Sequence, residues 1–308
     1  MATYLVTGGC GFIGSHLADA LIANGHRVRI LDDLSTGRRE NAPAAAEVIE
    51  GDVADGATVR QAIAGMDGCF HLAAIASVER SRLEWRATNR VNLAGTIEVF
   101  DAARGAKNGA PIPVVYASSA AVYGDNANVP LAESAVTRPL SAYGADKLGC
   151  ELHARVAQVV HGVGSTGFRF FNVYGPRQDP ASPYSGVISI FAQRIARGHE
   201  ITIFGDGLQS RDFVYVADVV AVLQAAMKAG PKGSSVFNLC TGRETSVTTL
   251  AATLADLSRT PLRQRHEAPR AGDIRRSLGN PDAMIAAFGL PADTMLAEGL
   301  RRTLAWMG

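Results

Sequence analysis

The sequence predicts a doubly wound α/β fold, in which a parallel sheet is covered by helices on both faces. Through the first half of the chain, short apolar segments alternate with longer amphipathic ones. A glycine-rich segment at residues 8–14 joins the first apolar segment to the first amphipathic one. Because this alternation requires right-handed crossovers between parallel strands, we expect a Rossmann domain.

The expected elements follow from these periodicities. We expect strands at residues 4–7, 27–31, 47–50, 69–72, 114–117 and 167–171, and helices at residues 12–24, 88–106 and 142–160. The alternation then breaks, because residues 173–186 contain three prolines, two glycines and two tyrosines, the composition of a loop. Helix and strand patterns resume at residues 213–227 and 236–239.

Two segments do not fit the alternation and indicate a second, smaller lobe. They are residues 200–204 and the arginine-rich stretch at residues 259–276. We therefore expect residues 1–172, with about 207–240, to form the Rossmann domain. Residues from about 173 to 206, with 241–308, should form a C-terminal lobe assembled from non-contiguous pieces.

Composition and charge exclude several classes of protein. A formal net charge of +1 provides no basic field for nucleic acid or an anionic membrane. The four cysteines and seven histidines are too scattered to predict a metal site. The first residues show no secretory leader, and no apolar stretch approaches the roughly 20 residues that span a bilayer. We expect a soluble, cytoplasmic protein.

The glycine-rich segment has the form of a dinucleotide-binding turn. Gly8, Gly11 and Gly14 permit a tight turn, close approach of the backbone to a pyrophosphate, and close helix–strand packing. Phe12 and Ile13 begin the next helix, whose N–H groups and partial positive charge suit an anion. A glycine-rich turn without a ligand is the alternative, but a strand and a helix flank the motif as it requires.

Carboxylates after the second and third strands favour NAD as the cofactor. Asp32 and Asp33 lie about twenty residues beyond the glycines, where a carboxylate accepts hydrogen bonds from ribose hydroxyls and repels a 2′-phosphate. Asp52, before Val53, is placed to reach the adenine amino group. Two alternatives stay open: Asp32 is a solvated carboxylate at a loop edge, or the arginines at residues 38–39 bind a phosphate.

A tyrosine and a lysine stand four residues apart, at Tyr143 and Lys147, and therefore share one helix face. A free tyrosine, with a pKa of about 10, is a poor base at neutral pH, but a neighbouring ammonium and a charged nicotinamide favour the phenolate. Such pairs are also common on surface helices. Ser118 and Ser119 strengthen the catalytic interpretation, because they follow the fifth strand at the edge where a doubly wound sheet binds ligands.

These residues resemble the extended short-chain dehydrogenase/reductase family, and within it the NAD-dependent nucleotide-sugar 4-epimerases that act on UDP-glucose and UDP-galactose. The resemblance covers nearly the whole chain. It is carried by motifs that occur in family order: residues 7–14, Asp32, Asp52-Val53, His71-Leu72-Ala73-Ala74, Asn92, Ser118-Ser119, Tyr123-Gly124, Tyr143, Lys147 and Phe170-Phe171-Asn172.

The resemblance implies a role for each of these residues. Tyr143, Lys147 and Ser119 would be catalytic. NAD would contact residues of the Rossmann domain: Gly8, Gly11, Phe12, Ile13, Gly14, Asp32, Asp33, Asp52, Val53, Leu72, Ala73, Ala74, Asn92, Ser118, Tyr143, Lys147 and Phe170. A UDP-sugar would contact Ser77, Ser119, Tyr143, Asn172, Val187, Ile188, Ile203, Phe204, Arg211, Arg270, Asp273 and Ser277.

Within the substrate set, the resemblance divides the nucleotide among the pieces of the C-terminal lobe. Asn172 and Arg211 would hold the diphosphate, Arg270 a phosphate and Asp273 the ribose. The base would lie against Val187, Ile188, Ile203 and Phe204. Arginine forks suit phosphate oxygens, and a carboxylate suits ribose hydroxyls. A solvated basic face is the alternative for the arginine-rich stretch.

The reaction that the resemblance implies is a hydride shuttle. Tyr143 takes the proton of the sugar 4-hydroxyl, hydride leaves C4, and the 4-keto sugar turns over and receives hydride on its opposite face. Related dehydratases carry an Asp-Glu pair, and decarboxylases a Glu, where this chain has Ala120 and Ala121. The sequence thus favours epimerisation. A nucleotide-sugar reductase or dehydratase of the same family and, from another class, a non-catalytic NAD-binding regulator are the alternatives.

The identity of the sugar is left open by the sequence. Ser277 stands where similar epimerases limit the sugar pocket, and its small side chain leaves room for an N-acetyl group or a C6 carboxylate. Arg80, Arg177 and Arg275 are candidates to meet a uronate. The resemblance also implies a homodimer formed by the helices at residues 88–106 and 142–160.

Overall fold

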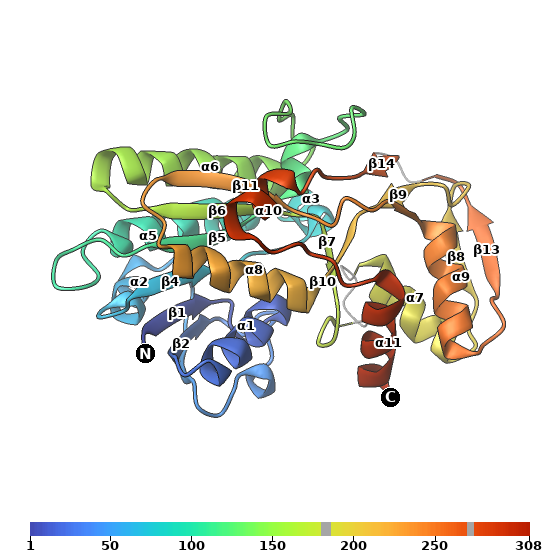
Figure 1. Cartoon of the computed structure of the whole chain (residues 1–308), viewed down its shortest axis with the longest axis horizontal. Coiled ribbons are helices and arrows are strands. Elements are labelled where there is room, and N and C mark those ends of the chain that lie inside the picture. Colours follow the sequence, from blue (N-terminus) through green and yellow to red (C-terminus); the bar gives the residue numbers. More distant parts are fainter. Residues whose placement is uncertain (180–185, 270–273) are drawn as a thin grey trace. The chain divides into compact units, whose positions relative to one another are not determined.

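Seven strands form one sheet within residues 1–179, 186–269 and 274–308, the part of the chain that the computed structural model describes (Figure 1). They are β1 (Thr3–Thr7), β2 (Arg27–Asp32), β3 (Glu47–Glu50), β4 (Gly68–His71), β5 (Val114–Ser119), β6 (Ser165–Phe170) and β11 (Ser234–Leu239). Their order is β11-β6-β5-β4-β1-β2-β3, and β1 pairs in parallel with both β2 and β4. The predicted doubly wound fold is confirmed. Since the strand order reverses at β1, the ligand crevice of such a sheet lies at the carboxyl ends of β1 and β4.

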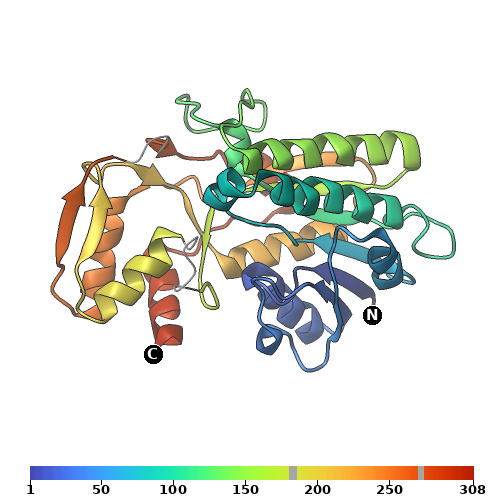
Figure 2. The ribbon, with the colours of Figure 1, turned by 180° about the vertical axis from the view of Figure 1, so that it is seen from behind.

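Helices cover this sheet on its two faces. On one face α2 (Gly56–Ile63), α5 (Gly95–Ala103) and α6 (Ala142–His161) pack together, and both views show α5 and α6 side by side (Figures 1 and 2). On the other face lie α1 (Phe12–Ala23) and α8 (Val216–Ala229), joined where Asn24 Nδ2 donates to Gln224 Oε1 at 2.8 Å. The predicted helix at residues 12–24 is confirmed.

The predicted single helix at residues 88–106 is wrong in its detail. The structure has α4 (Trp85–Asn89), then the π-helical turn η2 (Arg90–Ala94), and then α5, which ends at Ala103. A π turn inserts one residue into the helix, so it leaves the apolar periodicity nearly unchanged and cannot be read from it. Gly95 follows this turn and lets the helix pack closely against Val53, since a Cβ at residue 95 would lie 2.8 Å from Val53 Cγ1.

The chain divides by its contacts into two units. The first comprises Met1–Gly124, Thr137–Arg169 and Val220–Phe237, and the second Asp125–Val136, Phe170–Val219 and Asn238–Gly308. The strands of the second unit are β7 (Asn172–Tyr174), β8 (Ile201–Phe204), β9 (Ser210–Arg211), β10 (Phe213–Tyr215), β12 (Thr245–Ser246), β13 (Gln264–Glu267) and β14 (Arg276–Ser277). Its helices include α7 (Val187–Ala196), α9 (Val247–Ser258), α10 (Asp282–Phe288) and α11 (Leu296–Met307).

Short strand pairs explain how distant segments join the second unit. β8 pairs with β13, and β9 pairs with both β12 and β14, which brings together the two segments that did not fit the alternation. Because β9 pairs with β14 and β10 pairs with β7, residues 207–219 lie in this unit rather than with the Rossmann sheet. The functional assignment of the two units stays a prediction.

Candidate active site

The glycine-rich turn brings three stretches of backbone into contact. Gly8 has φ +69°, and a Cβ on it would lie 2.8 Å from the backbone nitrogen of Ala73, after β4. A Cβ on Gly14 would overlap the carbonyl oxygen of Gly8. The same oxygen accepts from the Gly11 N–H at 3.1 Å. Only glycine fits at positions 8 and 14, and α1 therefore starts next to the carboxyl ends of β1 and β4.

Gly11 is also the N-cap residue of α1, so the helix begins without a side chain over its first N–H groups. Phe12 and Ile13 form the first turn of α1 and are half-buried. The first N–H groups of a helix lack partners within it and carry a partial positive charge. The residues predicted for pyrophosphate binding therefore provide a site suited to an anion.

Asp32 is built into the glycine-rich turn and is only 7% exposed. Its Oδ2 accepts from the Cys10 N–H at 2.9 Å, and its Oδ1 accepts from the Leu34 N–H at 2.9 Å. Burial raises the pKa of this carboxyl, although the two N–H groups act against the shift. The alternative of a solvated loop carboxylate is therefore wrong. The neighbouring Asp33 is exposed and accepts instead from the Ser35 N–H and hydroxyl.

Asp52 is engaged by a residue that sequence reasoning missed. Its Oδ1 accepts from the Ala54 N–H at 2.8 Å, and its Oδ2 accepts from Arg90 Nη1 at 2.8 Å. Arg90 belongs to the π turn, far from Asp52 in sequence, and no local motif announces the pair. Val53, predicted to contact NAD, points into the core against Gly95.

A chain of buried hydrogen bonds links β1, β4 and the π turn. The Thr96 hydroxyl donates to the carbonyl oxygen of Asn92 at 2.6 Å, so its oxygen is the acceptor for His71 Nε2, at 2.9 Å. His71 Nδ1 must then accept from the Thr7 hydroxyl, at 2.8 Å. This assigns His71 as a neutral imidazole with its proton on Nε2.

The two ends of this chain hold the backbone after β4. The Thr7 hydroxyl oxygen accepts from the N–H groups of Leu72 and Ala73, each at 3.2 Å. At the other end Asn92 Oδ1 accepts from the Ile75 N–H at 2.7 Å, and its Nδ2 donates to the Ile75 carbonyl at 3.2 Å. Asn92 is fully buried, so its amide fixes the loop that was predicted to line the cofactor, which includes Ala74.

This network predicts that acid destabilises the protein through His71. Burial, with repulsion from Lys147, lowers the pKa of His71 to about 3, against about 6.5 in an unfolded chain. As the pH falls from 6.5 toward 3, the unfolded state takes up a proton that the folded state excludes. The free energy of unfolding should therefore fall by about 2 kcal/mol between pH 7.5 and pH 5.

Urea denaturation across this pH range measures the effect. The His71→Asn variant should show a shallower dependence on pH, whereas His199→Asn, at an exposed position, should keep that of the wild type. An unchanged slope in His71→Asn would show that His71 does not carry the dependence.

Tyr143 and Lys147 lie on the first turns of α6. The helix is capped by Ser141, whose Oγ accepts from the Gly144 N–H at 3.0 Å. Lys147 is only 3% exposed, and its Nζ donates to the carbonyl oxygen of Ala117 in β5 at 2.8 Å. The same Nζ lies 5.9 Å from the centre of the half-buried Tyr143 ring. A buried ammonium thus stands beside the phenol, at the carboxyl end of β5.

The two serines that end β5 point in different directions. Ser119 is half-buried and begins the 3-10 turn η3 (Ala120–Tyr123), where its Oγ accepts from the Ala121 N–H at 3.1 Å and keeps its own proton to donate. Ser118, predicted to line the cofactor, is 1% exposed and donates to Glu151 Oε1 at 2.5 Å. Consecutive side chains of a strand face opposite sides of the sheet, so the Ser118 hydroxyl faces the core.

The predicted base-binding residues of the second unit are divided between its core and its surface. Ile188 in α7 and Ile203 in β8 are almost completely buried. Val187 and Phe204, their neighbours in sequence, are half-buried and so remain accessible. Ile188 and Ile203 therefore pack the core behind the predicted wall and do not form its surface.

The predicted diphosphate residues of the second unit lie on its strands. Asn172 is exposed in β7, and its N–H donates to the Asp212 carbonyl at 3.0 Å. Arg211 in β9 pairs in register with the half-buried Ser277 of β14, and its Nη1 donates to the Ile274 carbonyl at 2.7 Å. Phe170, predicted beside the nicotinamide, is half-buried at the end of β6. Two further predicted substrate residues lie outside the described residues, namely Arg270 and Asp273.

Two of the arginines proposed for a uronate have carboxylate partners of their own. Arg80 donates to Glu84 at 2.8 Å, and Arg275 forms a two-pronged pair with Asp206, at 2.6 and 2.9 Å. The hydrogen bonds from Arg275 lower the pKa of Asp206 to about 2. Arg177 adopts φ +66° and is half-buried. Ser77, predicted for the substrate, caps α3 (Val78–Leu83) by accepting from the Arg80 N–H at 3.0 Å.

Within residues 1–179, 186–269 and 274–308, no three His, Cys, Asp or Glu side chains gather as metal ligands would. No helix in these ranges combines the length and the apolar character that crossing a membrane requires.

Comparison with known proteins places this arrangement in a family. The model of the NAD dependent epimerase/dehydratase family matches residues 4–240. A UDP-glucose 4-epimerase of Mycolicibacterium smegmatis is 38% identical to this chain. The alignment is 308 residues long and covers 97% of this chain and 96% of that protein.

Solved structures agree with this match. The structure of a UDP-glucose 4-epimerase of Thermotoga maritima with UDP-glucose has a TM-score of 0.94 and 35% identity, covering 99% of this chain and 98% of that one. A UDP-N-acetylglucosamine 4-epimerase of Methanobrevibacter ruminantium, in complex with UDP-N-acetylmuramic acid, has a TM-score of 0.93 and 35% identity at the same coverage. With its Rossmann sheet, its glycine-rich turn and its Tyr143–Lys147 pair, the chain belongs to the NAD dependent epimerase/dehydratase family.

Proposed function

We propose that this protein is an NAD-dependent epimerase that inverts C4 of a UDP-sugar, with UDP-glucose and UDP-galactose as the first candidates. One observation carries the proposal: a buried ammonium, a phenol and a serine hydroxyl all lie around the carboxyl end of β5. The residues in these positions are Lys147, Tyr143 and Ser119. The names of the similar proteins, which are epimerases of UDP-sugars, support the same reaction.

NAD fits the residues that the structure describes. The turn closed by Gly8 and Gly14 has no space for a Cβ and presents the uncapped start of α1, as a pyrophosphate site requires. The buried carboxylate of Asp32 stands at the end of β2, where it favours a ribose over a 2′-phosphate. NAD held by these residues would supply the acceptor for the hydride that leaves C4 and the donor when the hydride returns.

The residues of the chain control the proton that accompanies this hydride. Tyr143 takes the proton of the sugar 4-hydroxyl and returns it after the sugar has turned over. Lys147 holds its charge beside the phenol while it is anchored on β5. Ser119 donates to the same sugar oxygen as it becomes a ketone oxygen.

Two neighbouring residues favour epimerisation over elimination. Ala120 and Ala121 form the turn that directly follows Ser119, and they bring no acid or base to C5 or C6 of a sugar held there. The UDP group must hold the substrate while the sugar turns. We propose Asn172, Arg211, Val187 and Phe204 for this role, together with Arg270 and Asp273.

Product analysis after incubation with UDP-sugars tests the function. Purified protein supplied with UDP-glucose or UDP-galactose should convert each into the other, with no net consumption of NAD. UDP-N-acetylglucosamine and UDP-glucuronate, assayed in the same way, test whether the small Ser277 side chain admits a larger substituent. Failure to invert C4 in all four compounds would contradict the proposal.

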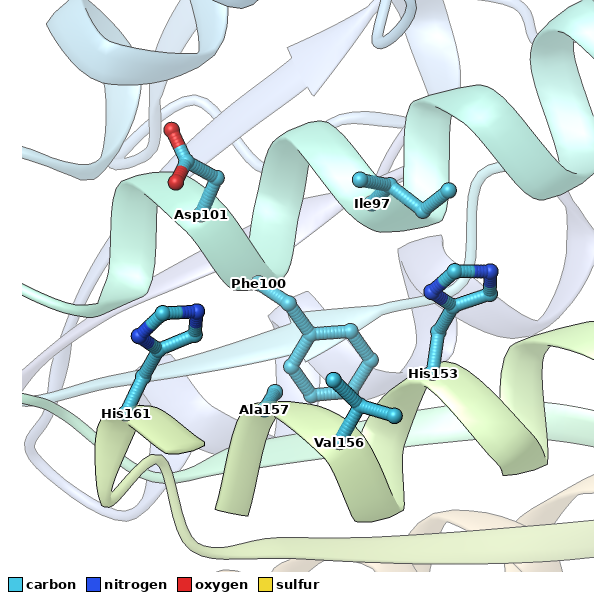
Figure 3. A pocket seen from close by; sticks show the side chains of 7 residues that line it. All are labelled: Ile97, Phe100, Asp101, His153, Val156, Ala157 and His161. Carbon is cyan, nitrogen blue, oxygen red and sulfur yellow. The ribbon is translucent and has the colours of Figure 1, made fainter. Parts of the chain in front are cut away.

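We further propose that the protein is a cytoplasmic homodimer held together by α5 and α6. Apolar side chains gather on the outer faces of these helices: Ile97, Leu152, Val156, Val159 and Val160 are 38%, 61%, 51%, 70% and 64% exposed. Figure 3 shows the Phe100 ring of α5 reaching toward Val156 and Ala157 of α6, between the side chains of His153 and His161. A second copy would remove this apolar surface from water.

Light scattering measures the predicted dimer. The Val156→Glu variant places a charge in this surface and should shift the molar mass toward that of one chain. Val136→Glu makes the same change at an exposed valine outside both helices and should leave the mass unchanged. A wild-type mass equal to that of one chain would refute the dimer.

A further inference from the structure

A buried ion pair lies in the first unit, between α6 and β6. Arg169 Nη2 and Nε donate to Glu151 Oε2 and Oε1 at 2.7 and 2.9 Å. Both side chains are 8% exposed. Removing two charges from water is costly, and pairs of this kind are often no more stabilising than apolar residues of the same volume. A contribution to stability therefore does not by itself account for its presence.

The pair holds the residues on both sides of Ser119. Before it in sequence, the Ser118 hydroxyl donates to Glu151 at 2.5 Å. After it, Arg169 Nη1 donates to the Tyr123 hydroxyl at 2.8 Å, and the guanidinium carbon lies 4.8 Å from the centre of the Tyr123 ring. Both anchors are buried, and the half-buried Ser119 lies between them at the start of the η3 turn. The position of its hydroxyl thus depends on both anchors.

Glu151 is in register with the two proposed catalytic residues of α6. Tyr143, Lys147 and Glu151 follow one another at intervals of four along α6 and so share one helix face. Lys147 bonds the carbonyl oxygen of Ala117, and Glu151 accepts from the next residue, Ser118. Two consecutive residues of β5, Ala117 and Ser118, are therefore bonded to one face of α6. These bonds fix the end of β5, which carries Ser119, relative to the first turn of α6, which carries Tyr143.

We propose that Glu151 and Arg169 are positioning residues, which hold the Ser119 hydroxyl in register with Tyr143. They touch neither substrate nor cofactor and act through Ser118 and Tyr123. This inference rests on the proposed function, because the proposed function gives the Ser119 hydroxyl its catalytic role.

A double-mutant cycle between Glu151→Gln and Ser119→Ala tests the inference. In the wild-type background Glu151→Gln should lower kcat about tenfold, with KM changed by less than about twofold. In the Ser119→Ala background the same change should lower kcat by less than about twofold, because the hydroxyl that it positions is gone. Equal effects in both backgrounds would overturn the proposal. Glu47→Gln breaks an ion pair with Arg29 on the far strands β2 and β3 and should leave kcat unchanged.

A second variant separates positioning from folding. Glu151→Leu combined with Arg169→Met replaces both charges with apolar groups of similar volume, so that no unpaired charge is left in the buried site. It should melt within a few degrees of the wild type and still show the loss in kcat. Full activity in this folded variant would overturn the proposal.

Hydrogen exchange gives a readout that needs no substrate. In Glu151→Gln, amides of residues 118–124 should exchange faster, while those of the middle of α6 keep their protection. Unchanged exchange at residues 118–124 would overturn the inference even if the wild type turned over no UDP-sugar. Inactivity of the wild type together with the faster exchange would count against the proposed function and not against the anchoring.

Discussion

Replacing Tyr143 by phenylalanine is expected to lower kcat for C4 inversion about a thousandfold, a loss within the range of general acid–base catalysis. The substitution removes one oxygen and keeps the half-buried ring, so the packing of α6 is preserved. Lys147 keeps its bond to the Ala117 carbonyl, which does not involve the phenol. NAD should therefore stay bound while turnover is lost. The measurements are kcat with UDP-galactose and the NAD content of the purified variant.

A matched control removes a phenol elsewhere in the same unit. Tyr4 in β1 is also half-buried, and Tyr4→Phe should retain full activity. Wild-type activity in Tyr143→Phe would favour a protein that binds NAD without catalysis. Loss of both activity and NAD would instead assign Tyr143 to cofactor binding.

The Rossmann sheet could be predicted from sequence because its signals are local. Each strand is a short apolar run, and the alternation of such runs with amphipathic stretches predicts parallel strands joined by right-handed crossovers. The break at Arg90–Ala94 could not be predicted, since a π turn shifts the helix by one residue without interrupting its apolar face. The strand pairs of the second unit also escaped prediction in detail, because strands as short as Ser210–Arg211 carry too little pattern to reveal a partner.

In the candidate site, too, the features that depend on neighbouring residues could be predicted, and those that depend on residues distant in sequence could not. The spacing of Tyr143 and Lys147 is a property of one helix, and the glycine motif is a property of one turn. The partners of Ser118 and Asp52 come from other elements, Glu151 in α6 and Arg90 in the π turn. Two adjacent serines look equivalent in the sequence. Only the direction of the last residues of β5 shows that one faces the core and the other does not.

The hydrogen-bond network from Thr7 to Asn92 shows that a family motif can mark a segment without revealing what each of its residues does. The sequence places His71 beside Leu72 and Ala73 and suggests only that the segment lines a cofactor. The structure adds that His71 is a buried, neutral link between β1 and the π turn. His71 therefore helps to hold the backbone that follows β4. The residue type alone does not reveal this role, because the partners of His71 come from other elements.

Replacing Gly14 by alanine is expected to weaken NAD binding by at least about a hundredfold and to destabilise the protein by about 1–3 kcal/mol. The new Cβ would overlap the carbonyl oxygen of Gly8 and lie 2.8 Å from the Gly9 Cα. Both contacts are with backbone, which cannot rotate away as a side chain would. The first turn of α1 must therefore move away from β1, and the N–H groups proposed to bind the pyrophosphate move with it. Titration with NAD and thermal melting measure the two effects.

Gly105→Ala is the matched control, because it makes the same substitution where a Cβ would meet only the Gly109 Cα, at 3.9 Å. It should leave NAD affinity unchanged and alter stability by no more than about 1 kcal/mol. If Gly14→Ala bound NAD as tightly as the wild type, the cofactor would not depend on the close approach of α1 to this turn. If it lost stability without losing affinity, Gly14 would be a packing residue of the sheet alone. The predicted result is the joint loss, because one displacement of the helix start disturbs both the β1–α1 contact and the anion site.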